Sequence, residues 1–327
     1  MGHVLKKIRI GGIAINKNRI YQNKRVLITG AGGFIGQHLV RHFQDHGACL
    51  STISRNKADF PQEVTQYLID IKNTQDVNDC IGECKPDYIF HLAAYKERNE
   101  GIGAFYSSIE TNLIGSLNLF SAATHLTSLQ SIVTLGTAEE YGNTIPPFTE
   151  KFRECPVTPY SFSKVCVSHM GELFSDLFDL PVTIIRPTLA YGPGQGTDMF
   201  LPSLIKSLLE DKPFEMTLGE QTRDFIYVTD LVEALILASR NTQAQGQIIN
   251  IGSSVPIKIA DIAEKIEKLI GKNGFVNIGK KPYRKNEVME YYVDVKKAED
   301  ILGWKAKTSL EDGLKETIAY YRGVKFL

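Results

Sequence analysis

A tyrosine and a lysine four residues apart, Tyr160 and Lys164, carry the chemistry that this sequence most directly indicates. They open a segment with a helical pattern, and this spacing places both side chains on one helix face, one turn apart. Free tyrosine has a pKa of about 10, so it acts as a base at neutral pH only if a positive charge such as a lysine ammonium stabilises its phenolate. Thr137, after an apolar run over 131–135, can hydrogen-bond the same substrate oxygen. The three residues suit the removal of a proton from a hydroxyl.

A glycine-rich stretch near the start of the chain is expected to hold a second reactant. The apolar run over 25–29 ends at a glycine, and two further glycines follow at intervals of three before a helical pattern begins. The first allows a tight turn off a strand, the second lets the backbone approach a pyrophosphate, and the third lets the helix lie close on the sheet. The expected dinucleotide contacts are Gly30, Gly33, Phe34, Ile35 and Gly36.

The apolar runs farther along the chain predict the sheet that positions these residues. Strands are expected over 48–54, 67–71, 87–94, 131–135 and 181–187. Four strand–helix units in succession imply an α/β fold with a doubly wound parallel sheet and right-handed crossovers.

The strand over 48–54 ends in Ser54-Arg55, where NAD-specific folds usually place an acid that holds the ribose 2′-hydroxyl. No carboxylate stands at either position. Because a guanidinium pairs with a 2′-phosphate that an acid would repel, we expect NADP(H) to be preferred, with NAD(H) possible.

Three motifs carry a resemblance to a known family: Gly-Gly-Phe-Ile-Gly at 32–36, His-Leu-Ala-Ala at 91–94 and Tyr-x-x-x-Lys at 160–164. Over roughly residues 25–322 the chain resembles the extended short-chain dehydrogenase/reductases, and among them the NAD(P)-dependent nucleotide-sugar epimerase/dehydratase family. The resemblance implies a Rossmann fold with a smaller C-terminal substrate-binding lobe and a site in the cleft between them.

Further site residues follow from the resemblance alone. Beside Tyr160 and Lys164, the implied cofactor contacts are Ser54, Arg55, Asp70, Ile71, Leu92, Ala93, Ala94 and Pro187. The implied substrate contacts are Arg223, Arg284 and Glu287, where arginine pairs with the nucleotide diphosphate and an acid accepts from the ribose. Leu189 stands where many sugar-nucleotide epimerases have Asn, so that contact is missing or moved.

The implied reaction is oxidation of a sugar C4 hydroxyl, with hydride passing to the nicotinamide. Glu139 resembles the catalytic Glu of nucleotide-sugar 4,6-dehydratases, whereas Ala138 replaces the acid that some of them use to release water; a 4-epimerase needs neither. An alternative is an NADPH-dependent 4-keto-6-deoxysugar reductase, which fits Arg55. A more distant alternative is a non-catalytic cofactor-sensing regulator, against which a tyrosine base argues.

Composition and charge bound the domains and partners. We expect a basic N-terminal extension (1–24), an NAD(P)-binding Rossmann domain (25–186) and a mainly nucleotide-sugar-binding lobe (187–327), interleaved with the Rossmann core. With 37 basic and 37 acidic residues, nothing global suggests a nucleic-acid or membrane partner. Without an apolar span, a signal-peptide pattern or paired cysteines, a cytoplasmic enzyme is expected.

Two further expectations concern helices. The helix that starts near Gly36 carries His38, His42 and His46 on one face, which we expect to be solvated, and no metal site is expected. The resemblance also implies a homodimer, paired through the Tyr160–Lys164 helix and the helix over 113–123.

Overall fold

A seven-stranded parallel sheet forms the centre of the protein, which we describe from a computed structural model over residues 21–96 and 101–323. The strand order is β3-β2-β1-β4-β5-β6-β11, so the chain reverses direction across the sheet between β1 and β4. The strands are β1 (Arg25–Thr29), β2 (Cys49–Ser54), β3 (Thr65–Leu68), β4 (Tyr88–His91), β5 (Ser131–Leu135), β6 (Val182–Pro187) and β11 (Ile248–Ile251). This confirms the predicted doubly wound α/β class.

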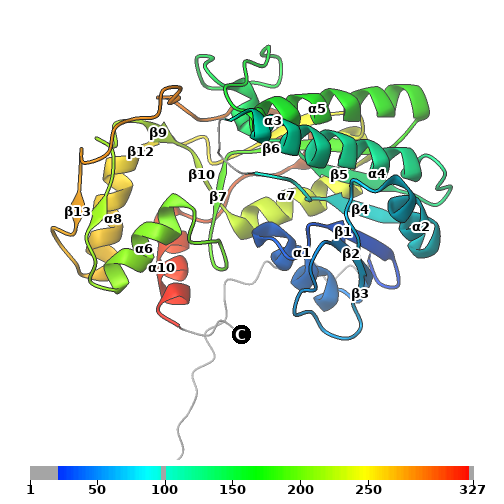
Figure 1. Ribbon diagram of the computed structural model, residues 1–327, viewed down its shortest axis with the longest axis horizontal. Coiled ribbons are helices and arrows are strands. Elements are labelled where there is room, and N and C mark those ends of the chain that lie inside the picture. Colours follow the sequence, from blue (N-terminus) through cyan, green and yellow to red (C-terminus); the bar gives the residue numbers. More distant parts are fainter. Residues whose placement is uncertain (1–20, 97–100, 324–327) are drawn as a thin grey trace, which may run out of the picture.

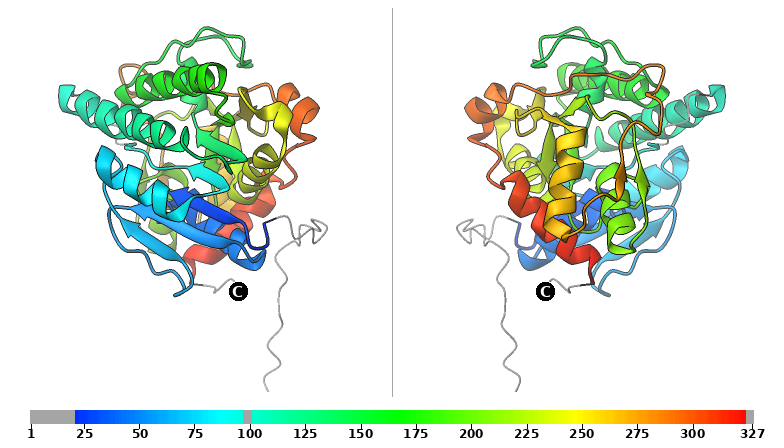
Figure 2. Two further views of the ribbon diagram at one scale, coloured as in Figure 1. Left: turned by 90° about the vertical axis from the view of Figure 1, so that its right-hand side faces the viewer. Right: turned by 90° about the vertical axis from the view of Figure 1, so that its left-hand side faces the viewer.

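Helices cover both faces of the sheet (Figure 1). One layer holds α2 (Thr74–Cys84), α3 (Ile102–Ser108), the π-helical turn η1 (Ile109–Ile114), α4 (Gly115–Ala123) and α5 (Pro159–Phe178). The other holds α1 (Phe34–Asp45), α7 (Val228–Arg240), the short η3 (Thr242–Ala244) and α9 (Lys296–Leu302). Figure 2 shows the same layers from the two sides. Burial of the strands on both faces explains why they read as continuous apolar runs rather than alternating ones.

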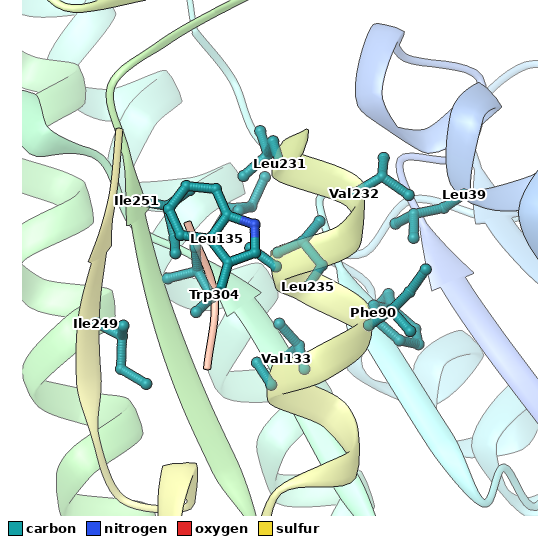
Figure 3. Packing of buried hydrophobic residues seen from close by; sticks show 14 of the residues in the cluster. Leu39, Phe90, Val133, Leu135, Leu231, Val232, Leu235, Ile249, Ile251 and Trp304 are labelled. Atoms are coloured by element: carbon teal, nitrogen blue, oxygen red, sulfur yellow. The ribbon is translucent and has the colours of Figure 1, made fainter. Parts of the chain in front are cut away.

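The core between the sheet and α7 is drawn in Figure 3. Leu231 and Leu235 lie one helical turn apart on α7 and belong to one buried cluster with Val133 and Ile249 of the sheet. Trp304, 1% exposed, closes this cluster and donates its Nε1 proton to the Asp230 carbonyl at 3.0 Å. The C-terminal part of the chain therefore completes the core of the Rossmann sheet.

A smaller lobe lies beside the carboxyl ends of the strands (Figure 1). Its helices are α6 (Phe200–Leu209), α8 (Ile259–Ile270) and α10 (Leu310–Tyr321). Its strand pairs are β7 (Leu189–Tyr191) with β10 (Phe225–Tyr227), β9 (Thr222–Arg223) with β12 (Ile257–Lys258), and β8 (Phe214–Glu215) with β13 (Val276–Asn277). Since β11 and α7 return to the main sheet, residues after 187 serve both parts.

Two features differ from the predicted succession of strand–helix units. Residues 55–64, between β2 and β3, contain no helix; Pro61 lies in this loop, and the Gln66 side chain pairs with both backbone polar groups of Ala58. The third strand ends at Leu68, so Asp70 lies in the following turn, and Asn73 rather than Asp70 caps α2. In both places local side-chain hydrogen bonds compete with regular structure.

The predicted N-terminal extension lies largely outside the described residues. In its described end Gln22 and Asn23 are exposed, whereas Tyr21 is 2% exposed and packs its ring edge-on against Phe43 and Tyr88. The Tyr21 hydroxyl shares a hydrogen bond of 2.6 Å with Ser239 on α7.

Candidate active site

All predicted site residues line one large cleft at the carboxyl ends of the parallel strands. Its volume of about 1410 Å³ exceeds the ~300–1,000 Å³ that is usual for one drug-sized ligand, so it has room for a dinucleotide and a second ligand together. Its lining includes Gly30, Gly33, Phe34, Ile35, Gly36, Ser54, Arg55, Asp70, Ile71, Leu92, Ala93, Ala94, Thr137, Glu139, Tyr160, Lys164, Pro187, Arg223, Arg284 and Glu287.

The glycine turn between β1 and α1 has a shape that other residues could not reproduce. Gly30 has φ +70°, and a Cβ there would lie 2.7 Å from the Ala93 backbone nitrogen. A Cβ on Gly36 would lie 2.6 Å from the Gly30 carbonyl oxygen, so this glycine lets α1 pack directly on the turn. Gly33 precedes α1, whose first amides face the cleft side of the turn. A pyrophosphate fits this backbone cradle.

The adenosine end of such a cradle is basic. Arg55 and Lys57 are exposed and line the cleft after β2, and the Ser54 hydroxyl donates to the Asn56 carbonyl at 2.7 Å. Asp59 lies in the same loop after β2 and also lines the cleft.

The proposed base and its lysine lie on the first turns of α5. Thr158 caps this helix, accepting from the Ser161 amide at 3.0 Å, and Pro159 starts it, so the helix begins directly before Tyr160. The Lys164 Nζ lies 6.0 Å from the centre of the Tyr160 ring and donates to the Leu135 carbonyl at 2.7 Å. The end of β5 thus fixes the lysine beneath the tyrosine.

Burial controls the charge of these groups. Lys164 is 3% exposed, and burial lowers its pKa to about 8. The nearby Glu140 charge has the opposite effect and raises the pKa of Lys164. His91 on β4 stays neutral because burial, and then the charge of Lys164, lower its pKa to about 3. Its two ring nitrogens form hydrogen bonds with the hydroxyls of Thr29 and Ser116, at 2.7 and 2.8 Å. His91 is therefore a structural histidine.

The short helix η2 (Ala138–Tyr141) carries the remaining residues of the turn after β5. Thr137 caps it, and its hydroxyl accepts from the Glu139 amide at 3.2 Å. Glu139 lines the cleft, whereas Glu140 points into the protein with 0% exposure. Residue 138 is an alanine and is fully buried. The acid that some dehydratases use to release water is therefore missing from this position.

The substrate end contains a charged pair and a tyrosine that sequence reasoning missed. Arg223 forms an ion pair with Glu287 and donates to the Val288 carbonyl at 2.7 Å, while Arg284 is exposed at the rim. Tyr291 also lines the cleft, where burial, followed by the Glu139 charge, raises its pKa well above the usual value. The only sequence signal for Tyr291 was its position four residues after Glu287.

The histidine face of α1 is only partly solvated, which differs from the predicted solvated face: His38, His42 and His46 are all half-buried. The His38 Nε2 lies 2.9 Å from the Pro193 carbonyl oxygen, and the His42 and His46 rings stack at 4.1 Å. Burial lowers the pKa of His42 to about 4. The turn at Pro193 covers this end of α1, which a single helix pattern cannot reveal. Among the described residues no three metal-binding side chains converge.

Comparison with known proteins agrees with this site. The model of the NAD dependent epimerase/dehydratase family matches residues 26–252. A UDP-N-acetyl-alpha-D-glucosaminuronate decarboxylase of Bacillus cytotoxicus is 30% identical over 92% of this chain and 99% of its own. A UDP-glucuronate 4-epimerase of Thermodesulfobacterium geofontis is 27% identical over 89% and 94%. The crystal structure of a UDP-glucuronic acid 4-epimerase from Bacillus cereus, in complex with UDP-glucuronic acid and NAD, superposes with a TM-score of 0.83 at 28% identity, covering 92% and 99%.

The chain therefore belongs to the NAD dependent epimerase/dehydratase family. It is an enzyme of the NAD-dependent nucleotide-sugar type, as the sequence predicted. No helix within the described residues is long and apolar enough to span a membrane.

Proposed function

We propose that the protein oxidises the C4 hydroxyl of a nucleotide-linked sugar as the first step of an epimerisation or a dehydration. The observation that carries this proposal is the convergence of Tyr160, Lys164 and Thr137 beside the glycine cradle, in one cleft with Arg223 and Glu287. When bound, the nicotinamide cofactor supplies the hydride acceptor. Tyr160 takes the hydroxyl proton, Lys164 stabilises the phenolate, and Thr137 orients the sugar oxygen.

The test is a panel of UDP-, GDP-, CDP- and dTDP-sugars, with and without NADPH, with products followed by mass spectrometry. An isobaric product identifies an epimerase, and loss of one water without net cofactor use identifies a dehydratase. If water is lost, Glu139→Gln should stop elimination while C4 oxidation continues, since Glu139 is the acid of η2 that lines the cleft. If none of the nucleotide sugars is converted, the proposal is refuted.

A second candidate is a single-step 4-keto-6-deoxysugar reductase, which the basic cofactor end favours. In the same panel it would add two hydrogens to a 4-keto substrate and consume NADPH. The exposed Arg55 and Lys57 support NADP(H) preference, although the solved relative holds NAD. Arg55→Ala should weaken NADPH binding by about 1.5–3 kcal/mol, roughly 10- to 100-fold, and leave NADH binding unchanged. Equal wild-type Kd values for NADPH and NADH would refute the preference.

We also propose a homodimer in the cytoplasm. Large apolar side chains that are 39–64% exposed lie on α5 and on the helix over 109–123: Ile114, Leu117, Phe162, Leu173, Leu177 and Phe178. Such a patch marks an interface. Light scattering should give a dimer for wild type and a monomer for Leu173→Glu with Leu177→Glu, whereas Leu68→Glu, on the sheet edge, should stay dimeric. The five cysteines are all free thiols, which agrees with a location in the reducing cytoplasm.

A further inference from the structure

The two adjacent acids of η2 face opposite ways, and only Glu139 reaches the cleft. Glu140 is completely buried, and burial raises its pKa. A carboxylate without water costs several kcal/mol unless charged or hydrogen-bonding partners compensate. Glu140 therefore needs hydrogen-bonding or charged partners, and the elements that carry these partners are the ones that it connects.

The Glu140 carboxylate joins three elements around the proposed base. One oxygen accepts from the Thr137 amide at 2.8 Å, which closes the turn that presents the Thr137 side chain. The other accepts from the Ser168 hydroxyl at 2.8 Å and pairs with the Arg186 guanidinium at 2.6 Å. Ser168 lies one turn beyond Lys164 on α5, and Arg186 lies on β6. A Cβ on Gly136 would overlap the same carboxylate, so the chain leaves space for it.

The charges in this cluster do not cancel without Lys164. Arg186 also pairs with Glu154 at 2.7 Å and lies over the Tyr141 ring at 4.8 Å. One guanidinium thus faces two carboxylates, which leaves a surplus negative charge beneath the active site. The titratable groups around it are Tyr160, Lys164, Cys166 and His169 on α5, His91 on β4, Tyr141 on η2 and Lys297 on α9, and the His169 Nε2 lies 3.4 Å from the Glu154 carboxylate. Of these cations, Lys164 is the one whose side chain is buried, and the Glu140 charge acts on it, whereas the exposed His169 lies beside Glu154.

We propose that Glu140 is a positioning residue of the active site, which fixes the turn of Thr137 and supplies the negative charge that keeps buried Lys164 protonated. The use of that charge in catalysis rests on the proposed function; the link from Glu140 to Lys164 does not. Glu140 raises the pKa of Lys164 against the effect of burial, which agrees with this role.

The test compares Glu140→Gln with Glu154→Gln, because both acids pair with the same guanidinium but only Glu140 also binds the Thr137 turn. The Lys164 titration is followed by carbon NMR of ε-labelled lysine, assigned with Lys164→Arg, and by the alkaline limb of the kcat/KM profile. In Glu140→Gln both should move to lower pH by about one unit or more. In Glu154→Gln both should stay at the wild-type pH.

The outcomes separate this inference from the proposed function. A shifted Lys164 titration in a protein that converts no nucleotide sugar would refute the proposed function and keep the inference. Turnover with an unshifted titration, or with equal shifts in both variants, would refute the inference alone. If Glu140→Gln does not fold, Glu140→Asp keeps the pair with Arg186 possible but withdraws the carboxylate from Ser168 on α5, and should move both titrations to lower pH by a smaller amount. If neither folds while Glu154→Gln does, Glu140 is only structural and the inference is overturned.

Discussion

The half of the cleft that we propose for the cofactor (the cofactor half) is built from backbone at the ends of parallel strands, whereas the half that we propose for the substrate (the substrate half) is built from side chains of distant segments. In the cofactor half, Gly30 contacts the backbone at Ala93, and both follow directly on neighbouring strands. In the substrate half, Arg223 is held by Glu287, 64 residues later. A backbone cradle tolerates few changes, because no side chain can move away, while a side-chain site can change its ligand by substitution.

The largest effect is expected at the junction of the two halves. Tyr160→Phe should lower kcat by about 10²–10⁴-fold, because the general base is lost while the helix and the cleft keep their shape. Stopped-flow or steady-state turnover measures the loss, and calorimetry should give unchanged Kd values for cofactor and nucleotide sugar. Wild-type turnover in this variant would remove the proposed mechanism.

The next effect should be confined to the cofactor half. Gly36→Ala places a Cβ 2.6 Å from the Gly30 carbonyl oxygen, so the turn or α1 must shift, and the Kd of NAD(P)H should rise roughly 10- to 100-fold. Gly32→Ala is the matched control, since its Cβ would meet only the Ala58 Cβ at 3.7 Å. Equal effects of the two substitutions on NAD(P)H binding would contradict this account of the cradle.

A third change should act on the substrate half alone. Arg223→Met removes a guanidinium that is half-buried at the cleft beside Glu287 and leaves that acid without this ion pair. Loss of charge-assisted hydrogen bonds to a diphosphate should raise the Kd of the nucleotide sugar by about 10- to 100-fold, measured by calorimetry. The Kd of NADH is the internal control; if it rises as much, the two halves are not independent.

The smallest effect is a pH dependence of stability in the cofactor half. His91 has a pKa of about 3 in the folded protein, against about 6.5 in an unfolded chain. Between these values the unfolded chain binds a proton that the folded protein does not, so stability falls as the pH drops from about 6.5 toward 3. At pH 5 the loss is roughly 2 kcal/mol, on the order of 5 °C in Tm. Scanning calorimetry of His91→Gln should show a flatter Tm profile; an equally steep one would assign the effect to other groups.

The parts of the fold and site that depend on neighbours in the chain could be predicted from the residues alone. A glycine turn after a strand and a Tyr-x-x-x-Lys pair at a helix start have their geometry fixed within a few residues, and succession of apolar runs fixes a parallel sheet. These predictions placed Gly30, Tyr160 and Lys164 on one edge of the sheet, where the structure has them.

Features that depend on packing between distant segments could not be predicted in this way. The chain pattern of α1 could not show that the turn at Pro193 covers His38, nor that β2 reaches β3 without a helix. Identical side chains at 139 and 140 point in opposite directions, one to the cleft and one to Arg186, because the turn of η2 and the position of β6 set their surroundings. Spacing along a chain fixes which residues share a turn, while burial and charge pairing arise from all the segments that fold around it.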